Sequence, residues 1–100
     1  MCGIVGVVSR AGPLRPDTRA AIRPMTARLH HRGPDGAAVL TSPDVALGHR
    51  RLAIIDRAGG HQPMANEDGT CWITFNGEIY NHRALRPILE GKGHQCRVVQ

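Results

Sequence analysis

The sequence predicts an α+β domain with a largely antiparallel sheet. Three observations lead to this fold class: a β-branched apolar run at residues 2–8, several strand-like segments in the middle of the chain, and two helical patterns. These segments do not alternate regularly as strand and helix, which a parallel doubly wound sheet would require. One hundred residues, 41% of them hydrophobic, suit one small domain with a modest core.

The N-terminal third predicts a strand followed by a helix. Residues 2–8 form a short, apolar and β-branched run, which is typical of a buried strand. Asp17 is a suitable helix N-cap, and Gly33-Pro34 is a suitable stop with the glycine in a left-handed conformation. Pro24 is expected to kink or delay the helix. The residues expected on its buried face recur at i, i+3 and i+7: Ile22, Met25 and Leu29.

The rest of the chain predicts further strands and a second helix. Ser42-Pro43-Asp44 provides a turn between the first two of these strands. The expected elements are strands at residues 37–41 and 45–56, a loop over 57–69, a strand at 71–75, a helix from Asn81 to Gly91 with Pro87 in its interior, and a strand within 94–99.

Composition excludes several function classes. The net charge is +5, but the basic residues are dispersed and only three aromatic residues are present, so we expect no nucleic-acid binding. No apolar stretch approaches the ~20 residues of a membrane helix, and no signal peptide is apparent. Three cysteines without CxxC spacing predict neither disulfides nor a zinc site, and therefore a cytoplasmic protein. None of the six histidines has a metal-binding spacing, so no metal site is expected.

Cys2 has two interpretations. A packed cysteine at the start of a strand is the more ordinary one. Alternatively, removal of Met1 would give one residue both a thiol and a free α-amine. An α-amine has a reference pKa of about 7.7–8.0 and can accept the thiol proton near neutral pH. The apolar run that follows would hold such a nucleophile in place.

Asn76-Gly77 also has two interpretations, as a tight turn or as an oxyanion hole. Asn-Gly is the strongest hairpin dipeptide, which favours the turn. The Asn76 side-chain amide and the Gly77 backbone N–H could instead point at one developing negative charge. Glu78, one residue further on, is either a solvated loop acid or a group that holds a substrate ammonium.

Arg50-Arg51 lies within an otherwise apolar strand. Strand residues alternate between faces, so one of the two side chains is expected to point inward or toward an edge. An inward guanidinium needs an anion. A substrate carboxylate, bound in bidentate fashion, and an internal salt bridge to Asp35 or Asp56 are equally favoured.

Five segments run in the order found in one known family. They are MCGIVGVV at the N-terminus, HRGPDG at residues 31–36, LGHRRLAIID at 47–56, QPM at 62–64 and FNGEIYNH at 75–82. Together they resemble the N-terminal glutaminase domain of class II glutamine amidotransferases of the glutamine-hydrolysing asparagine synthetase type. The resemblance implies an N-terminal-nucleophile hydrolase-like αββα sandwich, of which residues 2–100 would form the first part.

The resemblance also implies a role for each candidate residue. Cys2 would be the nucleophile and its own α-amine the general base. Arg51 would bind the α-carboxylate of glutamine and Glu78 its α-ammonium. Asn76 and Gly77 would form the oxyanion hole. The residues implied in glutamine binding are Arg51, Leu52, Ala53, Ile54, Ile55, Asn76, Gly77 and Glu78.

The implied reaction releases glutamate and ammonia from glutamine through a thioester on Cys2. The ammonia would pass to an ATP-dependent synthetase domain, which lies outside these 100 residues and would use Mg-ATP to convert aspartate to asparagine. The chain itself would need no cofactor, and the longer enzyme would be a homodimer. The alternatives are a non-catalytic remnant or binding module of the same fold, and a glutaminase half that serves amidation of another carboxylate.

Overall fold

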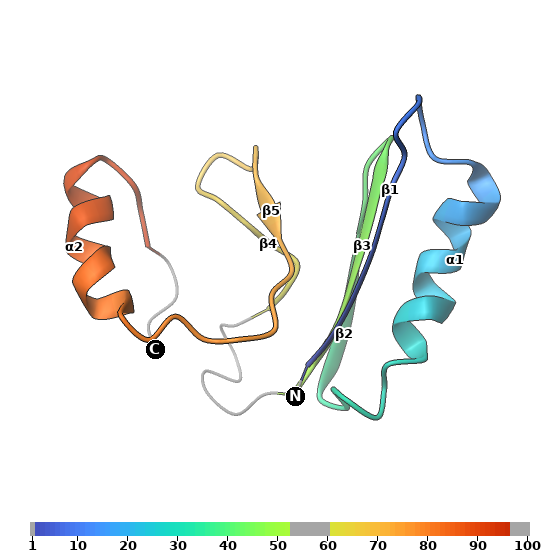
Figure 1. Cartoon of the computed structure of the whole chain (residues 1–100), viewed down its shortest axis with the longest axis horizontal. Helices are drawn as coiled ribbons and strands as arrows, with labels where there is room; N and C mark the ends of the chain where they lie inside the picture. Colours follow the sequence, from blue (N-terminus) through green and yellow to red (C-terminus); the bar gives the residue numbers. More distant parts are fainter. Residues whose placement is uncertain (1, 53–60, 97–100) are drawn as a thin grey trace.

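The computed structural model describes residues 2–52 and 61–96, which form an α+β fold of two antiparallel sheets and two helices (Figure 1). The predicted α+β class with antiparallel strands is therefore confirmed. The elements in chain order are β1 (Gly3–Val8), α1 (Pro16–Ala27), β2 (Gly36–Thr41), β3 (Val45–Arg51), β4 (Met64–Ala65), β5 (Trp72–Ile73) and α2 (His82–Gly91).

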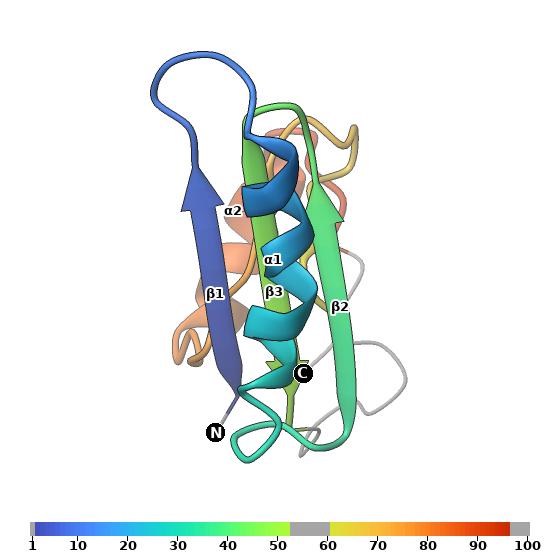
Figure 2. The ribbon, with the colours of Figure 1, turned by 90° about the vertical axis from the view of Figure 1, so that its right-hand side faces the viewer.

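The larger sheet has the strand order β1-β3-β2, with β3 in the centre and antiparallel to both neighbours. Gly3 of β1 lies opposite Arg50, and Gly36 of β2 lies opposite Arg51. The helix α1 lies across one face of this sheet (Figure 2). Since side chains alternate along a strand, every second residue of β3 faces α1 and the others face the opposite side.

The small core lies between α1 and the sheet. Ile22 is almost completely buried there and packs with Leu14 and Ala46. The half-buried valines Val5, Val7 and Val39 surround this cluster. The buried apolar cluster of the described residues therefore lies on the α1 face of the sheet.

The buried face of α1 differs from the expected one. Met25 is 39% exposed, and Thr26 is buried in its place beside Ile22. The reason is Gly48 in β3, where a Cβ atom would overlap Thr26 Oγ1. Because Gly48 has no side chain, α1 approaches the sheet closely at Thr26, which donates a hydrogen bond to Ile22 O (2.6 Å).

The ends of α1 also differ from the prediction. The helix begins at Pro16, so Asp17 lies in its first turn and is not the N-cap. Pro24 is accommodated inside the helix, which ends at Ala27. Gly33 does not have a positive φ, so the expected left-handed cap was wrong.

The second half of the chain contains less regular structure than predicted. The expected strand at residues 71–75 is reduced to β5, because its partner β4 supplies only two residues. That partner lies inside the expected loop over 57–69, which was therefore wrong at Met64–Ala65. Residues 94–96 form no strand. The predicted strand residues 53–56 and 97–99 lie outside the described residues.

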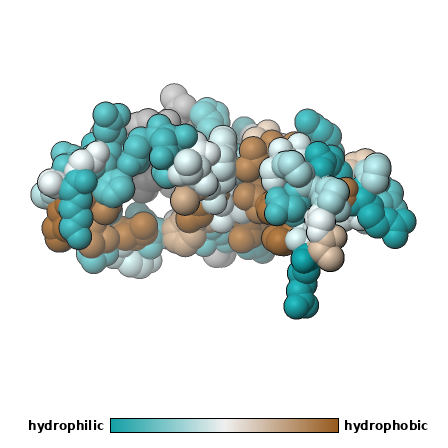
Figure 3. Space-filling view, turned by 90° about the horizontal axis from the view of Figure 1, so that it is seen from above, coloured by the Kyte–Doolittle hydropathy of each residue, from teal (hydrophilic) through white to brown (hydrophobic). Residues whose placement is uncertain are grey.

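The helix α2 forms as predicted and includes Pro87, with Asn81 in the N-cap position. None of its residues is buried. Its apolar side chains Leu85, Ile88 and Leu89 are exposed, as are Trp72 and Ile73 of β5. Figure 3 shows such apolar surface at the end of the molecule formed by α2 and again beside the larger sheet.

The molecule is less compact than its size allows. The radius of gyration is 15.0 Å, against about 13 Å for a compact domain of 100 residues. Its accessible surface is 7131 Å², against roughly 5,500 Å² expected for a compact chain of this mass. The sheet face opposite α1 and the faces of β5 and α2 thus leave apolar area in contact with water. No helix of the described residues is long and apolar enough to span a membrane.

Candidate active site

Cys2 lies where the start of β1 meets the end of β3. The antiparallel pairing of Gly3 with Arg50 brings Cys2 beside Arg51 and Leu52. The backbone N–H of Leu52 donates to Cys2 Sγ (3.3 Å), and the thiol lies 3.9 Å from Leu52 O. Cys2 is half-buried. Two backbone groups of one residue therefore fix the direction of the sulfur while part of it stays accessible.

The two adjacent arginines of β3 lie on opposite faces of the sheet. Arg50 belongs to the α1 side, and its Nε donates to Gly33 O (2.8 Å). Arg51 lies on the other face, which it shares with Cys2, and only 8% of its surface is exposed. The structure thus places a buried arginine at the β3 position beside Cys2 of the neighbouring strand. Asp56, one of the two expected salt-bridge partners, lies outside the described residues.

The loop at residues 31–36 contacts the start of β1 and the end of β3, the corner of the sheet where Cys2 and Arg51 lie. Arg32 Nε donates to the carbonyl oxygen of Cys2 (3.1 Å). The Asp35 backbone N–H donates to Arg51 O (2.9 Å). Gly33 packs so closely on β3 that a Cβ atom would overlap the backbone of Arg50. The motif at residues 31–36 does not by itself predict these contacts of Arg32 and Gly33.

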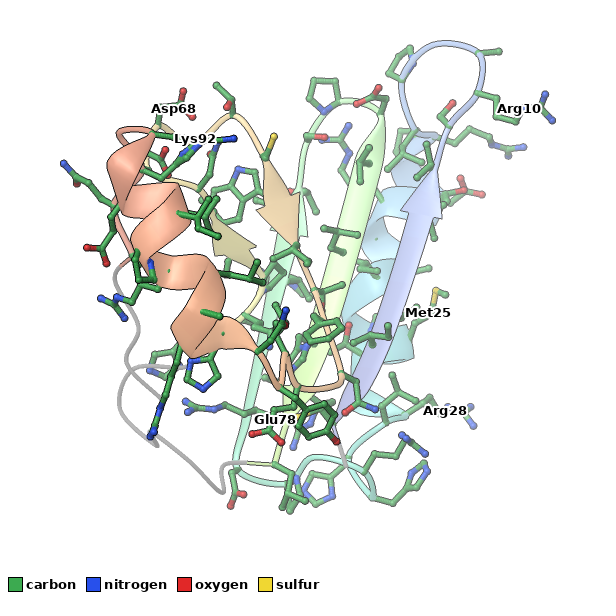
Figure 4. All side chains as sticks on the ribbon, turned by 60° about the vertical axis from the view of Figure 1, so that its left-hand side comes forward. Arg10, Met25, Arg28, Asp68, Glu78 and Lys92 are labelled. Atoms are coloured by element: carbon green, nitrogen blue, oxygen red, sulfur yellow. The ribbon has the colours of Figure 1, made fainter. Side chains whose placement is uncertain are left out.

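Asn76, Gly77 and Glu78 follow β5 in a segment without regular structure that leads into α2. Asn76-Gly77 is thus not a hairpin turn, and the Phe75 ring covers Gly77 so that a Cβ there would lie 2.8 Å from Phe75 Cζ. Figure 4 places Glu78 at the same end of the molecule as the start of β1.

The predicted site residues fall into two groups. The structure brings Cys2, Arg51 and Leu52 together. Within the described part of the chain, neither Cys2 nor Arg51 forms a hydrogen bond with Asn76, Gly77 or Glu78. Ala53, Ile54 and Ile55 lie outside the described residues.

His49 is a further buried group near the site. It precedes Arg51 by two residues, so both side chains lie on the same face, and only 1% of its surface is exposed. Its Nδ1 forms a hydrogen bond with Thr74 Oγ1 (2.7 Å). Burial, and secondly the charge of Arg51, lower the pKa of His49 from its ordinary 6.5. The ring is therefore neutral at pH 7. No spacing or motif in the sequence indicated this contact.

The cysteines and histidines form no metal site within residues 2–52 and 61–96: no three His, Cys, Asp or Glu side chains gather there around one point. Cys2, Cys71 and Cys96 are all free thiols. The chemistry that this corner offers is that of a thiol, a buried guanidinium and backbone donors, which suits a substrate with a carboxylate and an electrophilic carbonyl.

The chain belongs to the glutamine amidotransferase domain family, whose profile matches residues 1–99. Within this family, the chain is similar to glutamine-hydrolyzing asparagine synthetases. It is 46% identical over 97 residues to asparagine synthetase (glutamine-hydrolyzing) 3 of Arabidopsis thaliana and 47% identical over 96 residues to asparagine synthetase (glutamine-hydrolyzing) 1 of Bacillus subtilis. It is 44% identical over 103 residues to the corresponding enzyme of Sandersonia aurantiaca.

These matches cover 94–99% of this chain but only 15–19% of the three relatives. The chain thus spans less than a fifth of the length of the proteins that it resembles. The family resemblance inferred from the five sequence segments is confirmed.

Proposed function

We propose that this chain carries the glutamine-hydrolysing site of an asparagine-synthetase-type enzyme, with Cys2 as the nucleophile. The observation that carries the proposal is the position of Cys2 Sγ, 3.3 Å from the Leu52 backbone N–H and beside the buried Arg51. Membership of the glutamine amidotransferase domain family supports the same reading.

The reaction begins once Met1 has been removed. The α-amine of Cys2 accepts the thiol proton, and the thiolate attacks the side-chain carbonyl carbon of glutamine. The amine then returns the proton to the leaving nitrogen, which departs as ammonia and leaves a γ-glutamyl thioester. Water, activated by the same amine, hydrolyses the thioester to glutamate and restores the thiol.

Two further residues bind the substrate, and two others stabilise the oxyanion that develops during the reaction. Arg51 pairs with the α-carboxylate and Glu78 with the α-ammonium. The Asn76 side chain and the Gly77 N–H donate to the oxyanion, a contribution that is commonly worth about 3–4 kcal/mol per donor. The backbone of Leu52 lines the substrate. Glu78 is exposed and has no ion pair within the described residues, which leaves its carboxylate accessible to a ligand.

The arrangement of the elements supports an αββα sandwich of the N-terminal-nucleophile hydrolase type. Figure 1 shows α1, the larger sheet, the β4–β5 pair and α2 in that order across the molecule. The nucleophile then lies at one end of the larger sheet, at the start of its edge strand β1.

The ammonia is expected to serve a partner activity. The printed names of the relatives describe asparagine synthetases, so we propose transfer to an ATP-dependent synthetase domain that uses Mg-ATP to form asparagine from aspartate. A cytoplasmic homodimer of the longer enzyme belongs to the same proposal. Amidation of another carboxylate would use an identical glutaminase half.

The test is glutamate release from glutamine by the folded chain whose N-terminus is shown by intact mass to be Cys2. We expect glutamate and ammonia in equal amounts, complete loss in Cys2→Ser, and full retention in Cys71→Ser, which changes an exposed cysteine. Release that survives Cys2→Ser would contradict the proposal. A folded chain that begins at Cys2 and releases no glutamate would indicate the alternative, a non-catalytic module.

A further inference from the structure

His49 is the most deeply buried polar side chain among the described residues, at 1% exposure. It lies in the central strand β3, opposite Ile4 of β1 and Ala38 of β2. It shares the face of the sheet opposite α1 with Arg51, about 7 Å further along the strand. A buried polar group in a small, loosely covered sheet requires a partner that offsets its desolvation.

That partner comes from the second half of the chain. Nδ1 of His49 lies 2.7 Å from Thr74 Oγ1, whereas Nε2 is buried without a hydrogen-bond partner among the residues that the structure describes. The Thr74 hydroxyl therefore fixes the orientation of the whole ring. A neutral imidazole has one N–H and one acceptor nitrogen, so it can form this bond without placing a second positive charge beside Arg51.

The bond also fixes the backbone around Thr74. This residue directly follows β5, and the next residue is held by a hydrogen bond from the Phe75 N–H to Gln62 Oε1. Asn76 and Gly77 come immediately afterwards. In Figure 4 the chain runs from β5 along the sheet face opposite α1 to Glu78. The imidazole–hydroxyl contact thus ties the start of this segment to the strand that carries Arg51.

We propose that His49 and Thr74 are positioning residues that hold the Asn76-Gly77 donors toward Cys2. This inference rests on the proposed glutaminase function. An oxyanion donor must lie within 2.7–3.1 Å of the developing charge, and a displacement of about 1 Å can cost about 100-fold in rate. The bond between His49 and Thr74 acts on that geometry without touching the thiol.

The test compares Thr74→Val, which removes the hydroxyl at nearly constant shape, with Thr74→Ser, which retains it. Each variant of the full chain is measured in three ways: kcat for glutamine hydrolysis, the rate of Cys2 alkylation by iodoacetamide, and hydrogen exchange of the amides at residues 75–78. Alkylation by iodoacetamide needs the Cys2 thiol but no oxyanion hole. A variant that loses kcat but keeps its alkylation rate therefore has displaced oxyanion donors and an intact Cys2. Exchange of the β1 and β3 amides reports whether the sheet remains folded.

For Thr74→Val we expect kcat to fall by about 10- to 100-fold, faster exchange at residues 75–78, and an alkylation rate within about two-fold of the wild type. Thr74→Ser should keep all three values near the wild type. An unchanged kcat in Thr74→Val, or unchanged exchange at 75–78, would overturn the inference. If the wild-type chain releases no glutamate, the proposed function fails, and the exchange measurement still decides whether Thr74 anchors the segment.

Discussion

Replacing Gly33 by alanine should open the corner where the ends of β1 and β3 meet. Gly33 does not have a positive φ, so its backbone conformation does not exclude alanine. The added Cβ would nevertheless overlap the Arg50 carbonyl and lie 2.6 Å from Arg51 N. Both are backbone atoms of the central strand and cannot swing aside. The loop must therefore retreat, which weakens the Arg50 Nε to Gly33 O bond and the Asp35 N to Arg51 O bond.

The expected loss in the free energy of unfolding has two sources, the overlap of the new Cβ with β3 and the two weakened hydrogen bonds. Overpacking against a rigid neighbour costs about 1–3 kcal/mol. Each weakened hydrogen bond adds about 0.5–1.5 kcal/mol, and somewhat more for the charged donor. Because an exposed loop can relax in part, we take a total near 3 kcal/mol. For a domain of this size that lowers Tm by roughly 12–24 °C.

The assay is urea unfolding followed by circular dichroism, with Gly91→Ala as the matched control. Gly91 ends α2, and a Cβ there would meet no atom within 4 Å. That variant should be neutral or more stable by up to about 1 kcal/mol, since alanine favours a helix. Equal unfolding midpoints for Gly33→Ala and the wild type would refute the close packing of the loop on β3.

Three further predictions use other contacts. Gly48→Ala should destabilise the fold by about 1–3 kcal/mol, because its Cβ would overlap Thr26 Oγ1 and lie 2.9 Å from Val5 Cγ1; adding Thr26→Ala should restore part of the loss in urea unfolding, and simple additivity of the two losses would contradict this. The lowered pKa of His49 means that the unfolded chain takes up this proton first as pH falls below about 6.5. The free energy of unfolding should therefore decrease from pH 7.5 to 5.5 more steeply in the wild type than in His49→Asn, and parallel pH profiles would count against a buried neutral ring. Arg51→Lys should raise KM for glutamine at least about ten-fold with a smaller change in kcat, because lysine cannot bind a carboxylate in bidentate fashion; an unchanged KM would remove Arg51 from the substrate site.

Local sequence patterns were sufficient to predict most helices and strands in the first half of the chain. The β-branched run at residues 2–8 predicted β1 to within one residue, although β1 is an edge strand with alternate residues exposed and not a buried strand. The turn at Ser42-Pro43-Asp44 correctly separated β2 from β3. The buried face of α1 could not be predicted, because Gly48, 22 residues after Thr26, decides which residue approaches the sheet. The two-residue β4 was missed for a similar reason. Its pairing with β5 depends on a partner that no local pattern reveals.

In the candidate site, too, local sequence predicts some features, whereas others depend on residues far apart in the chain. Residue type and order suggested Cys2 and Arg51, and the antiparallel register places them side by side. The bond from Arg32 to the Cys2 carbonyl spans 30 positions, and the bond between His49 and Thr74 spans 25. Neither has a signature in the sequence, because each depends on the assembled sheet.

The central claim is that Cys2 is a nucleophile at a glutamine site. Its most direct test is mass spectrometry of the chain after incubation with a glutamine analogue whose side-chain amide is replaced by a diazoketone. We predict that the protein begins at Cys2, takes up one label per chain on that residue, and is protected by excess glutamine. Retention of Met1, or a label on Cys71 or Cys96 with Cys2 unmodified, would contradict the account.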